Sequence, residues 1–474
     1  MRPIGLSLLI GLAAAFAAHA ADPFAAYLNS TPTTTTVLSE EKSGSGAQAI
    51  AIRRFTFPSR GGVNTVYGIF AFPQAAGTYP GILLLHGGGS NAEDLAGLAQ
   101  GFARIGYAML AIDLPGICGA ANHSSGPWEA RPAGEGPRFE VAAGAQNSTL
   151  ADAEIAGLEA FNWLRAQANV KPAAMGITGF SWGGYSTTIL SGLLGDKVKA
   201  AYSVYGCGFY EIGSFWKDIV AKLPAAERET WLANLDAGRR APGMKAAYFL
   251  EAASNDTYFW PDAVGATLAA IPSAPNLPNH MWAPNLDHKQ LASASAMQRL
   301  WFDWHLKGSG TAFPRTRVAR IDPQTDRSRK ARIEIEASGG VVIDSVRLWY
   351  SLADQPWTKR IWIAVPATLA DGTWSASLPA SLADKDCDWF AQSTDSRGVA
   401  TASGMQHAAP LGPVTIMRGA ARPVNTSPSD LGGGRRILFP NASDVATGAR
   451  DASGRRYAPA KRHGTPTEAN AWHR

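Results

Sequence analysis

The sequence predicts an α/β fold with a mostly parallel sheet flanked by helices, followed by a smaller all-β domain. In the first part of the chain, short apolar runs such as Pro80–Leu85 and Tyr107–Ile112 alternate with stretches of helical periodicity. Continuous apolar runs are typical of strands buried on both faces, and their alternation with helices favours a parallel sheet. From Ala331 onwards apolar residues recur at every second position, because Ile333 and Ile335 alternate with charged residues. This second pattern predicts an antiparallel sandwich of short strands.

The individual elements follow from these periodicities in chain order. Two strands, Ala49–Phe57 and Val63–Phe72, flank a hairpin-like turn. The further strands expected in the first domain are Pro80–Leu85, Tyr107–Ile112, Met175–Thr178, Val198–Tyr205, Ala246–Ala252 and Asn279–Ala283. The expected helices are Glu93–Gly106, Thr149–Ala168, Gly184–Leu194, Ile212–Leu223, Ala225–Leu235 and Gln290–Leu306. The strands expected in the second domain are Ala331–Ala337, Val341–Tyr350, Arg360–Val365, Thr373–Leu378 and Asp388–Thr394.

Residues 1–20 have the pattern of a secretory signal peptide. Arg2 precedes an apolar stretch from Ile4 to Ala18, and Ala18-His19-Ala20 has the small-residue form of a cleavage site. We therefore expect cleavage after Ala20 and a secreted or periplasmic protein. No later stretch reaches about 18 consecutive apolar residues, so no membrane span is expected in the mature protein.

The excess positive charge lies near the end of the chain. The formal net charge is +5, and residues 422–474 contain nine Lys or Arg against four Asp or Glu, which accounts for the whole excess. The remainder is balanced, which argues against nucleic-acid binding by the main body. The strand pattern stops near residue 413, and we expect a basic, disordered tail over 413–474.

These patterns divide the rest of the chain into three parts. Residues 21–48 are rich in Thr and Ser and weakly patterned, which predicts a flexible N-terminal segment. The α/β domain is expected over 49–308, with a small helical lid inserted at 209–243. The sandwich is expected over 313–412, and its pattern is similar to that of fibronectin-type or immunoglobulin-like modules.

The segment Gly179-Phe180-Ser181-Trp182-Gly183 lies between a predicted strand and a predicted helix. A serine at such a turn points its hydroxyl away from the sheet, and the flanking glycines let neighbouring backbone pass closely. In this context the G-x-S-x-G pattern resembles the nucleophile elbow of the α/β-hydrolase superfamily. The resemblance covers about residues 49–308, and it implies the α/β-hydrolase fold with Ser181 as the nucleophile.

The resemblance also implies an acid and then a histidine that follow Ser181, each after a successive strand. A serine hydroxyl needs a base about 2.6 to 3.5 Å away and a third group that orients the base. His288 is the expected base, because His280 lies within a strand and His305 within the final helix. Asp256 is the expected acid, because it follows a strand directly.

Two further carboxylates lie in the same region. Asp262 is a rival for the role of acid, whereas Asp287 is adjacent to His288 and poorly placed to orient it. The acid fixes the imidazole tautomer and stabilises the imidazolium without taking up the proton.

An oxyanion hole is also implied. Its donors are expected to be the backbone N–H of Trp182 and one N–H of the loop His86-Gly87-Gly88-Gly89, with Gly88 preferred and Gly89 next. Such donors stabilise the developing charge by roughly 3 to 4 kcal/mol each.

Residues 117–146 form a long loop that should lie on the same side of the sheet as Ser181. Trp128, Arg131 and Arg138 are candidates for lining a substrate pocket, and a solvated insertion without substrate contact is the alternative.

The three cysteines, Cys118, Cys207 and Cys387, have no spacing relative to histidine that is typical of a zinc site. No metal or cofactor is expected. A disulfide between Cys118 and Cys207 and two separate buried thiols are both compatible with the sequence.

Within the superfamily the chain looks closest to the branch of dienelactone hydrolases, acetyl xylan esterases and prolyl oligopeptidases. Ser181 departs from the cysteine nucleophile of dienelactone hydrolases proper, and the residues before Ala49 leave no room for an oligopeptidase propeller. The resemblance implies a secreted serine hydrolase that cleaves carboxylic esters with short acyl groups, including acetyl esters of sugars. A prolyl oligopeptidase-like serine peptidase and a lipase are the alternatives.

Overall fold

The computed structural model describes residues 22–132, 134–273 and 277–412. The expected signal peptide over 1–20 and the expected tail over 413–474 lie outside these residues. Among the helices that are described, none is both long enough and apolar enough to cross a membrane.

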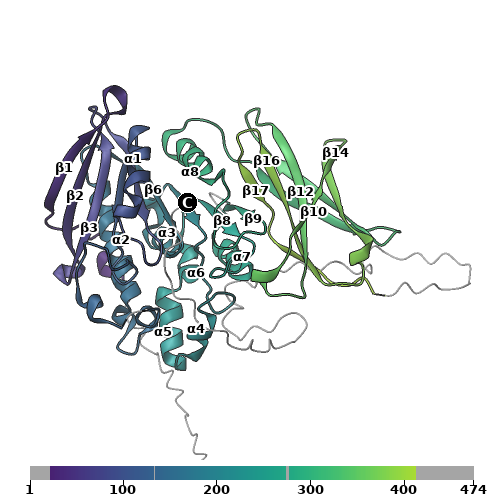
Figure 1. Ribbon diagram of the computed structural model, residues 1–474, viewed down its shortest axis with the longest axis horizontal. Coiled ribbons are helices and arrows are strands. Elements are labelled where there is room, and N and C mark those ends of the chain that lie inside the picture. Colours follow the sequence, from purple (N-terminus) through teal and green to yellow (C-terminus); the bar gives the residue numbers. More distant parts are fainter. Residues whose placement is uncertain (1–21, 133, 274–276, 413–474) are drawn as a thin grey trace, which may run out of the picture. The chain divides into compact units, whose positions relative to one another are not determined.

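The first domain is built on a nine-stranded sheet with the order β1-β2-β3-β5-β4-β6-β7-β8-β9 (Figure 1). Strands β1 to β3 and the β3–β5 pair are antiparallel, whereas all pairs from β5 to β9 are parallel. The strands are Thr36–Ser43, Ile50–Ser59, Asn64–Pro73, Tyr79–Leu85, Ala108–Ile112, Val170–Phe180, Ala200–Val204, Ala247–Ala253 and Asn279–Ala283, numbered β1 to β9 in chain order. The predicted mostly parallel sheet is therefore confirmed, and the antiparallel pairs at one end make it mixed.

Helices cover both faces of this sheet. The helices of the first domain are α1 (Ala96–Arg104), α2 (Thr149–Arg165), α3 (Trp182–Leu194), α4 (Lys217–Lys222), α5 (Ala225–Leu235), α6 (Ala237–Arg240), α7 (Pro261–Ala270) and α8 (Ala294–Phe302), of which α4 and α5 belong to the segment inserted after β7. The chain moves along the sheet in one direction from β4 to β5 and in the other from β5 to β6, so right-handed crossovers place α1 and α2 on opposite faces. Phe102 of α1 contacts Phe302 of α8, with 6.4 Å between ring centroids, which puts these two helices on the same face.

The segment before the sheet differs from the sequence-based expectation. We expected residues 21–48 to be flexible, yet Phe24 is fully buried and Thr36–Ser43 forms β1. The side-chain amide of Asn162 on α2 donates to the carbonyls of Leu28 and Ser30. Strand β1 is almost fully exposed and is joined to β2 by backbone pairing, so it has no apolar period that a sequence could display.

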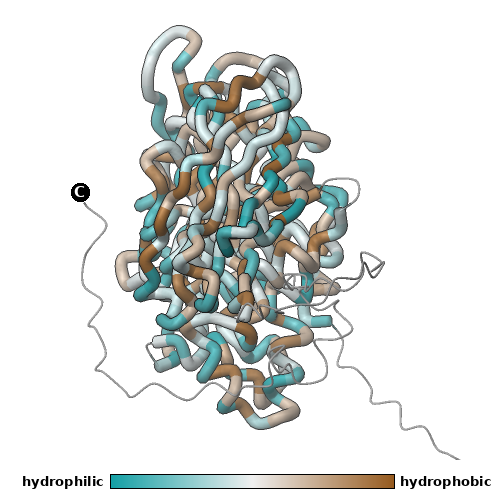
Figure 2. The backbone as a smooth tube through the Cα atoms, turned by 90° about the vertical axis from the view of Figure 1, so that its right-hand side faces the viewer, coloured by the Kyte–Doolittle hydropathy of each residue, from teal (hydrophilic) through white to brown (hydrophobic). Residues whose placement is uncertain are grey.

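The second domain contains two antiparallel sheets with the orders β10-β11-β15-β14 and β13-β12-β16-β17, and β18 pairs with β16. Its strands, β10 to β18, are Arg315–Pro323, Arg329–Glu336, Ile343–Leu352, Ile363–Pro366, Thr368–Ala370, Thr373–Leu378, Cys387–Asp395, Ala400–Ala402 and Gln406–Ala408. Between the sheets lies a core that includes Ile333, Leu348, Leu378 and Trp389. Figure 2 shows hydrophobic and hydrophilic stretches interspersed along the chain, as expected where strands bury alternate side chains.

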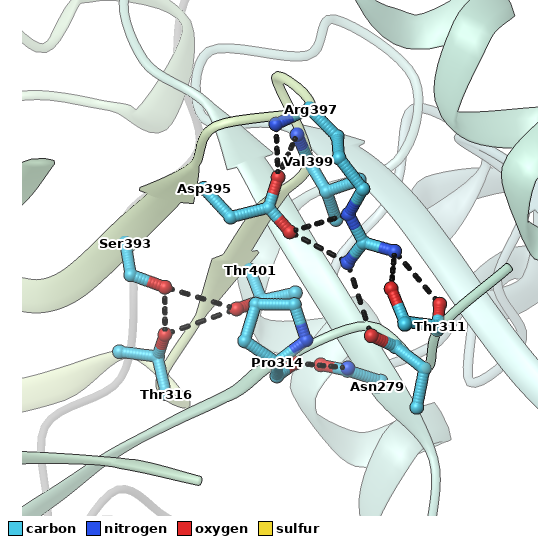
Figure 3. A network of polar contacts seen from close by, with 10 residues as sticks. Asn279, Thr311, Pro314, Thr316, Ser393, Asp395, Arg397, Val399 and Thr401 are labelled. Atoms are coloured by element: carbon cyan, nitrogen blue, oxygen red, sulfur yellow. Dashed lines mark hydrogen bonds and ion pairs between the residues drawn. The ribbon is translucent and has the colours of Figure 1, made fainter. Parts of the chain in front are cut away.

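The chain that joins the two domains is fixed by hydrogen bonds. Figure 3 shows the Arg397 guanidinium between the Asp395 carboxylate, 2.6 Å from its Nη2, and the Thr311 carbonyl, 2.7 Å from its Nη1. In the same view, the Asn279 amide on β9 donates to the Pro314 carbonyl at 2.9 Å. The linker is therefore held at both domains.

The second domain also contacts β9, the last strand of the large sheet. The backbone N–H of Trp282 donates to the Gln392 side-chain oxygen at 3.0 Å, and His280 Nε2 lies 3.1 Å from the Ser403 carbonyl. Phe390 of β16 packs against Trp282, with 6.1 Å between ring centroids, within a hydrophobic cluster that is continuous with the core of the first domain.

Candidate active site

Ser181 lies at a sharp turn between β6 and α3. Its backbone has φ 56° and ψ −118°, a conformation that non-glycine residues adopt rarely and that is typical of a nucleophile elbow. A β-carbon on Gly183 would lie 2.2 Å from the Leu85 carbonyl oxygen, so only glycine lets the start of α3 pass the end of β4.

Asp256 and His288 meet above the ends of β8 and β9. His288 Nδ1 lies 2.9 Å from Asp256 Oδ2, and the other carboxylate oxygen accepts the N–H groups of Tyr258 at 2.7 Å and Phe259 at 3.0 Å. Asp256 is only 1% exposed. An ionised carboxylate accepts but does not donate, so Nδ1 carries the proton and Nε2 has the free lone pair.

Nε2 of His288 is buried and has no hydrogen-bond partner in the described part of the chain. The hydrogen bond that we expected from the Ser181 hydroxyl to this nitrogen is therefore not formed. Catalytic hydrogen bonds are often long without substrate and tighten only in the complex. Both residues contact the end of β7, because the Ser181 N–H donates to the Val204 carbonyl and the ring of the next residue, Tyr205, is tilted against the His288 imidazole with 4.3 Å between centroids.

The glycine-rich loop after β4 lies against the elbow. A β-carbon on Gly87 would lie 3.2 Å from Ser181 Cβ, and one on Gly88 would lie 2.9 Å from the Trp182 ring. His86 is fully buried, and burial lowers its pKa. Its neutral ring accepts from the Leu114 N–H at Nε2 and contacts the Gly87 carbonyl through Nδ1 at 2.7 Å. Because C=O and N–H of one trans peptide point in opposite directions, this contact turns the Gly88 N–H away from His86.

The rival carboxylates have other partners. Asp262 on α7 accepts the indole N–H of Trp357 at 2.9 Å. Asp287 accepts the N–H of Thr257 at 2.7 Å and also the N–H of His288 at 2.7 Å, so it joins the acid loop to the histidine loop.

His280 and His305, the two histidines that we rejected as the base, are held in structural positions. His280 is 8% exposed within β9, and burial lowers its pKa to about 4. His305 packs on Trp301 in the π-helical turn Asp303–Lys307, with 4.2 Å between ring centroids.

The three candidate pocket residues from the long loop lie in two places. Arg138 is 8% exposed, and its Cζ lies 4.8 Å from the Trp182 ring centroid beside the elbow. Trp128 and Arg131 instead line a separate cavity of about 300 Å³, together with Arg60 and Gln146.

Aromatic side chains connect the elbow to the histidine. The Trp182 and Trp216 ring centroids are 4.6 Å apart, Trp216 stacks on Tyr258 at 5.8 Å, and Tyr258 lies 5.0 Å from His288. Tyr210 stacks on Trp216 at 4.9 Å. Sequence reasoning assigned no role to Tyr210 or Tyr258. The available signal was that these aromatic residues follow strands at the carboxyl edge of the sheet.

The inserted segment 209–243, which we expected to be a lid, is anchored at its base by Asp236. This buried carboxylate accepts the N–H groups of Phe209 at 2.9 Å and Gly238 at 2.9 Å, at the two ends of the inserted helices α4 and α5. Cys118 and Cys207 are both free thiols, so the disulfide left open by the sequence is absent.

A comparison with family models gives one match relevant to this geometry. Residues 80–246 match the family described as the alpha/beta hydrolase fold. The sheet order, the elbow at Ser181 and this match agree, and the chain has the α/β-hydrolase fold. A comparison with curated proteins found no match.

Several solved structures are similar to the chain at low identity. Acetyl xylan esterase 1 from a Thermoanaerobacterium species is 16% identical, with a TM-score of 0.48 and coverage of 59% of this chain and 91% of that one. An acetyl xylan esterase from a Paenibacillus species is 16% identical, with a TM-score of 0.49 and coverage of 59% of this chain and 92% of that one. A puromycin-hydrolyzing peptidase from Mycobacterium tuberculosis is 15% identical, with a TM-score of 0.39 and coverage of 56% of this chain and 40% of that one.

Proposed function

We propose that this chain is a serine hydrolase that cleaves carboxylic esters with short acyl groups, with Ser181 as nucleophile, His288 as base and Asp256 as acid. The observation that carries the proposal is the state of the His288 imidazole. One nitrogen is bound to a buried carboxylate and the other has no partner among the described residues, and both His288 and Ser181, in its strained turn, contact the end of β7.

In this mechanism Ser181 Oγ attacks the ester carbonyl carbon while His288 Nε2 accepts the hydroxyl proton. The negative charge on the carbonyl oxygen is stabilised by the N–H groups of Gly88 and Trp182. His288 then gives its proton to the departing alcohol, and the carbon–oxygen bond breaks to leave an acyl group on Ser181. Water, deprotonated by the same imidazole, releases the acid and restores the serine.

The lid supports a compact acyl group and a polar alcohol. Tyr210 and Trp216 are buried against Trp182, which restricts the space next to the nucleophile. Tyr210 Oη and Trp216 Nε1 are buried without a hydrogen-bond partner among the described residues. If substrate binding opens this contact, the hydroxyl groups of a saccharide ester can supply the missing partners.

The lid does not favour a peptidase. Exopeptidases hold the substrate's charged terminus with fixed charged side chains, and the lid offers the carboxylates of Glu211 and Asp218 but no paired Glu-Glu element. Glu211 is paired with Arg239 at 2.6 Å, and burial raises its pKa to about 7. An amino terminus would have to displace the guanidinium in order to bind there.

The test is a hydrolysis panel with the purified chain. We expect a higher kcat/KM for 4-nitrophenyl acetate than for long-chain esters or aminoacyl nitroanilides. Ser181→Ala should lose activity by on the order of a millionfold and should no longer react with a fluorophosphonate probe. Ser191→Ala, which removes a buried serine hydroxyl within α3, should keep both properties. Preference for an aminoacyl nitroanilide would favour the peptidase, and preference for long-chain esters would favour a lipase.

A further inference from the structure

A loop of the second domain, Trp357–Trp362 between β12 and β13, is rigidly attached to its own domain. The Arg360 guanidinium lies over the Trp357 ring, with 3.4 Å from Cζ to the centroid, and pairs with the Asp388 carboxylate of β16. The side chains of Arg360 and Asp388 are 8% and 6% exposed. An ion pair this well excluded from water holds the loop in one conformation.

This loop binds the segment that carries the acid. The Asn255 side-chain amide donates to the Arg360 carbonyl at 2.6 Å, and Asn255 directly precedes Asp256. Asn255 is 7% exposed, so water competes little for this hydrogen bond.

The same loop binds the segment that carries the histidine. Asn285 donates to the Trp362 carbonyl at 2.9 Å and accepts the Trp362 N–H at 2.7 Å, which makes a reciprocal pair with the backbone. Asn285 has φ 60°, a left-handed conformation that asparagine tolerates better than most residues. It lies three residues before His288.

Ser254 connects these two contacts. Its hydroxyl accepts the Asn285 N–H at 2.9 Å and donates to the Asn255 side-chain oxygen at 2.7 Å. The acid segment, the histidine segment and the loop of the second domain therefore form one hydrogen-bond network.

We propose that the Trp357–Trp362 loop is a positioning element of the active site, and that Asn255 and Asn285 are its positioning residues. This inference rests on the proposed function. The loop sets the distance between Asp256 and His288 because it binds the chain one residue before Asp256 and three residues before His288. The second domain thereby takes part in catalysis without contacting the substrate.

The test compares two asparagines that both bind the second domain or its linker. Asn285→Gly removes the side-chain contacts while glycine keeps the left-handed backbone without strain. Asn279→Ala removes a hydrogen bond of similar length, to Pro314, and also the side-chain acceptor of the His280 N–H, both of which lie outside this network. Both variants of the full chain are measured by ester hydrolysis, by the rate of fluorophosphonate labelling and by deuterium uptake at 254–258 and 285–291.

We expect Asn285→Gly to lower kcat by about 10- to 100-fold with KM changed less than about twofold, because a small misplacement of catalytic groups is costly. Its labelling rate should fall in parallel, and both segments should take up deuterium faster. Asn285→Asp, which keeps the acceptor for Trp362, should recover part of kcat. Asn279→Ala should leave kcat and deuterium uptake in both segments unchanged.

Equal effects of the two substitutions on kcat, or unchanged uptake at 254–258 and 285–291 in Asn285→Gly, would overturn the inference. Lack of Ser181-dependent hydrolysis and labelling in the unsubstituted chain would instead reject the proposed function. The deuterium measurement still decides whether the loop positions these segments, so the two failures are distinguishable.

Discussion

Glu251 of β8 is a buried carboxyl group next to the proposed active site. One oxygen accepts from Tyr202 Oη and Gln290 Nε2, both at 3.1 Å, whereas Oε1 has no partner among the described residues. Burial raises its pKa to about 7. The folded protein therefore holds this proton more tightly than the unfolded chain does, and the stability contributed by the protonated group is lost as the pH rises from about 4.5 to about 7.

Glu251→Gln should remove this pH dependence. The amide mimics the protonated carboxyl and cannot ionise, so the variant should gain up to about 3 kcal/mol relative to the parent chain between pH 5 and pH 8. Urea denaturation at both pH values measures the difference, and the exposed Glu229→Gln serves as control. A constant difference between variant and parent across this range would show that Glu251 is already ionised at pH 5.

At the same scale, the sequence predicts some residues of the candidate site and not others. The positions of Ser181, Asp256 and His288 at one edge of the sheet could be predicted, because each follows a strand with a recognisable apolar pattern. The roles of Asn255 and Asn285 could not, because their partners are backbone groups 105 and 77 residues further along the chain. Any residue type supplies the same backbone N–H and C=O groups, so a hydrogen bond to the backbone does not constrain which residue stands at the partner position.

Among the elements, the buried strands β4 to β9 could be predicted and the N-terminal segment could not. Parallel strands are covered on both faces and must be apolar, whereas β1 is held by its backbone and by ion pairs such as Arg53–Glu40 at 2.8 Å. Ahead of β1, Phe24 is buried and Tyr27 and Leu28 are partly buried against the same core, which is too few apolar residues to form a periodic pattern.

Phe24→Ala should destabilise the first domain by about 3 kcal/mol, because it empties a fully buried aromatic site. The nearby ion pair between Asp22 and Arg240, at 2.6 Å, would lose its anchor as well. Urea denaturation provides the measurement. Leu38→Ala removes a side chain of β1 that is 57% exposed and should change the free energy of unfolding by less than about 0.5 kcal/mol. Similar effects of the two substitutions would mean that the segment contributes no buried contact.

At the scale of the whole molecule, the change of period near Ala331 predicts a second β-rich domain, but it does not predict how closely that domain is joined to the first. Trp282 and Phe390 each look like an ordinary core residue of their own domain, yet they share one hydrophobic cluster. An apolar pattern predicts that a side chain is buried, but it does not predict which other part of the chain packs against it. The contact between these two residues is therefore visible only in the folded structure.

The contacts on β9 have a consequence for solubility. The outermost strand of a sheet exposes unpaired N–H and C=O groups that can recruit a strand from another molecule. On β1, this hazard is reduced by the charged run Glu40-Glu41-Lys42, whereas β9 has the uncharged sequence Asn279-His280-Met281-Trp282-Ala283 and relies on Gln392 and Ser403 to occupy its backbone and side chains. A chain that ends at Gly308 should therefore form β-rich aggregates that scatter light and bind thioflavin T, while the full chain stays clear at the same concentration. A truncated chain that remained monodisperse would show that β9 does not need the second domain to prevent aggregation.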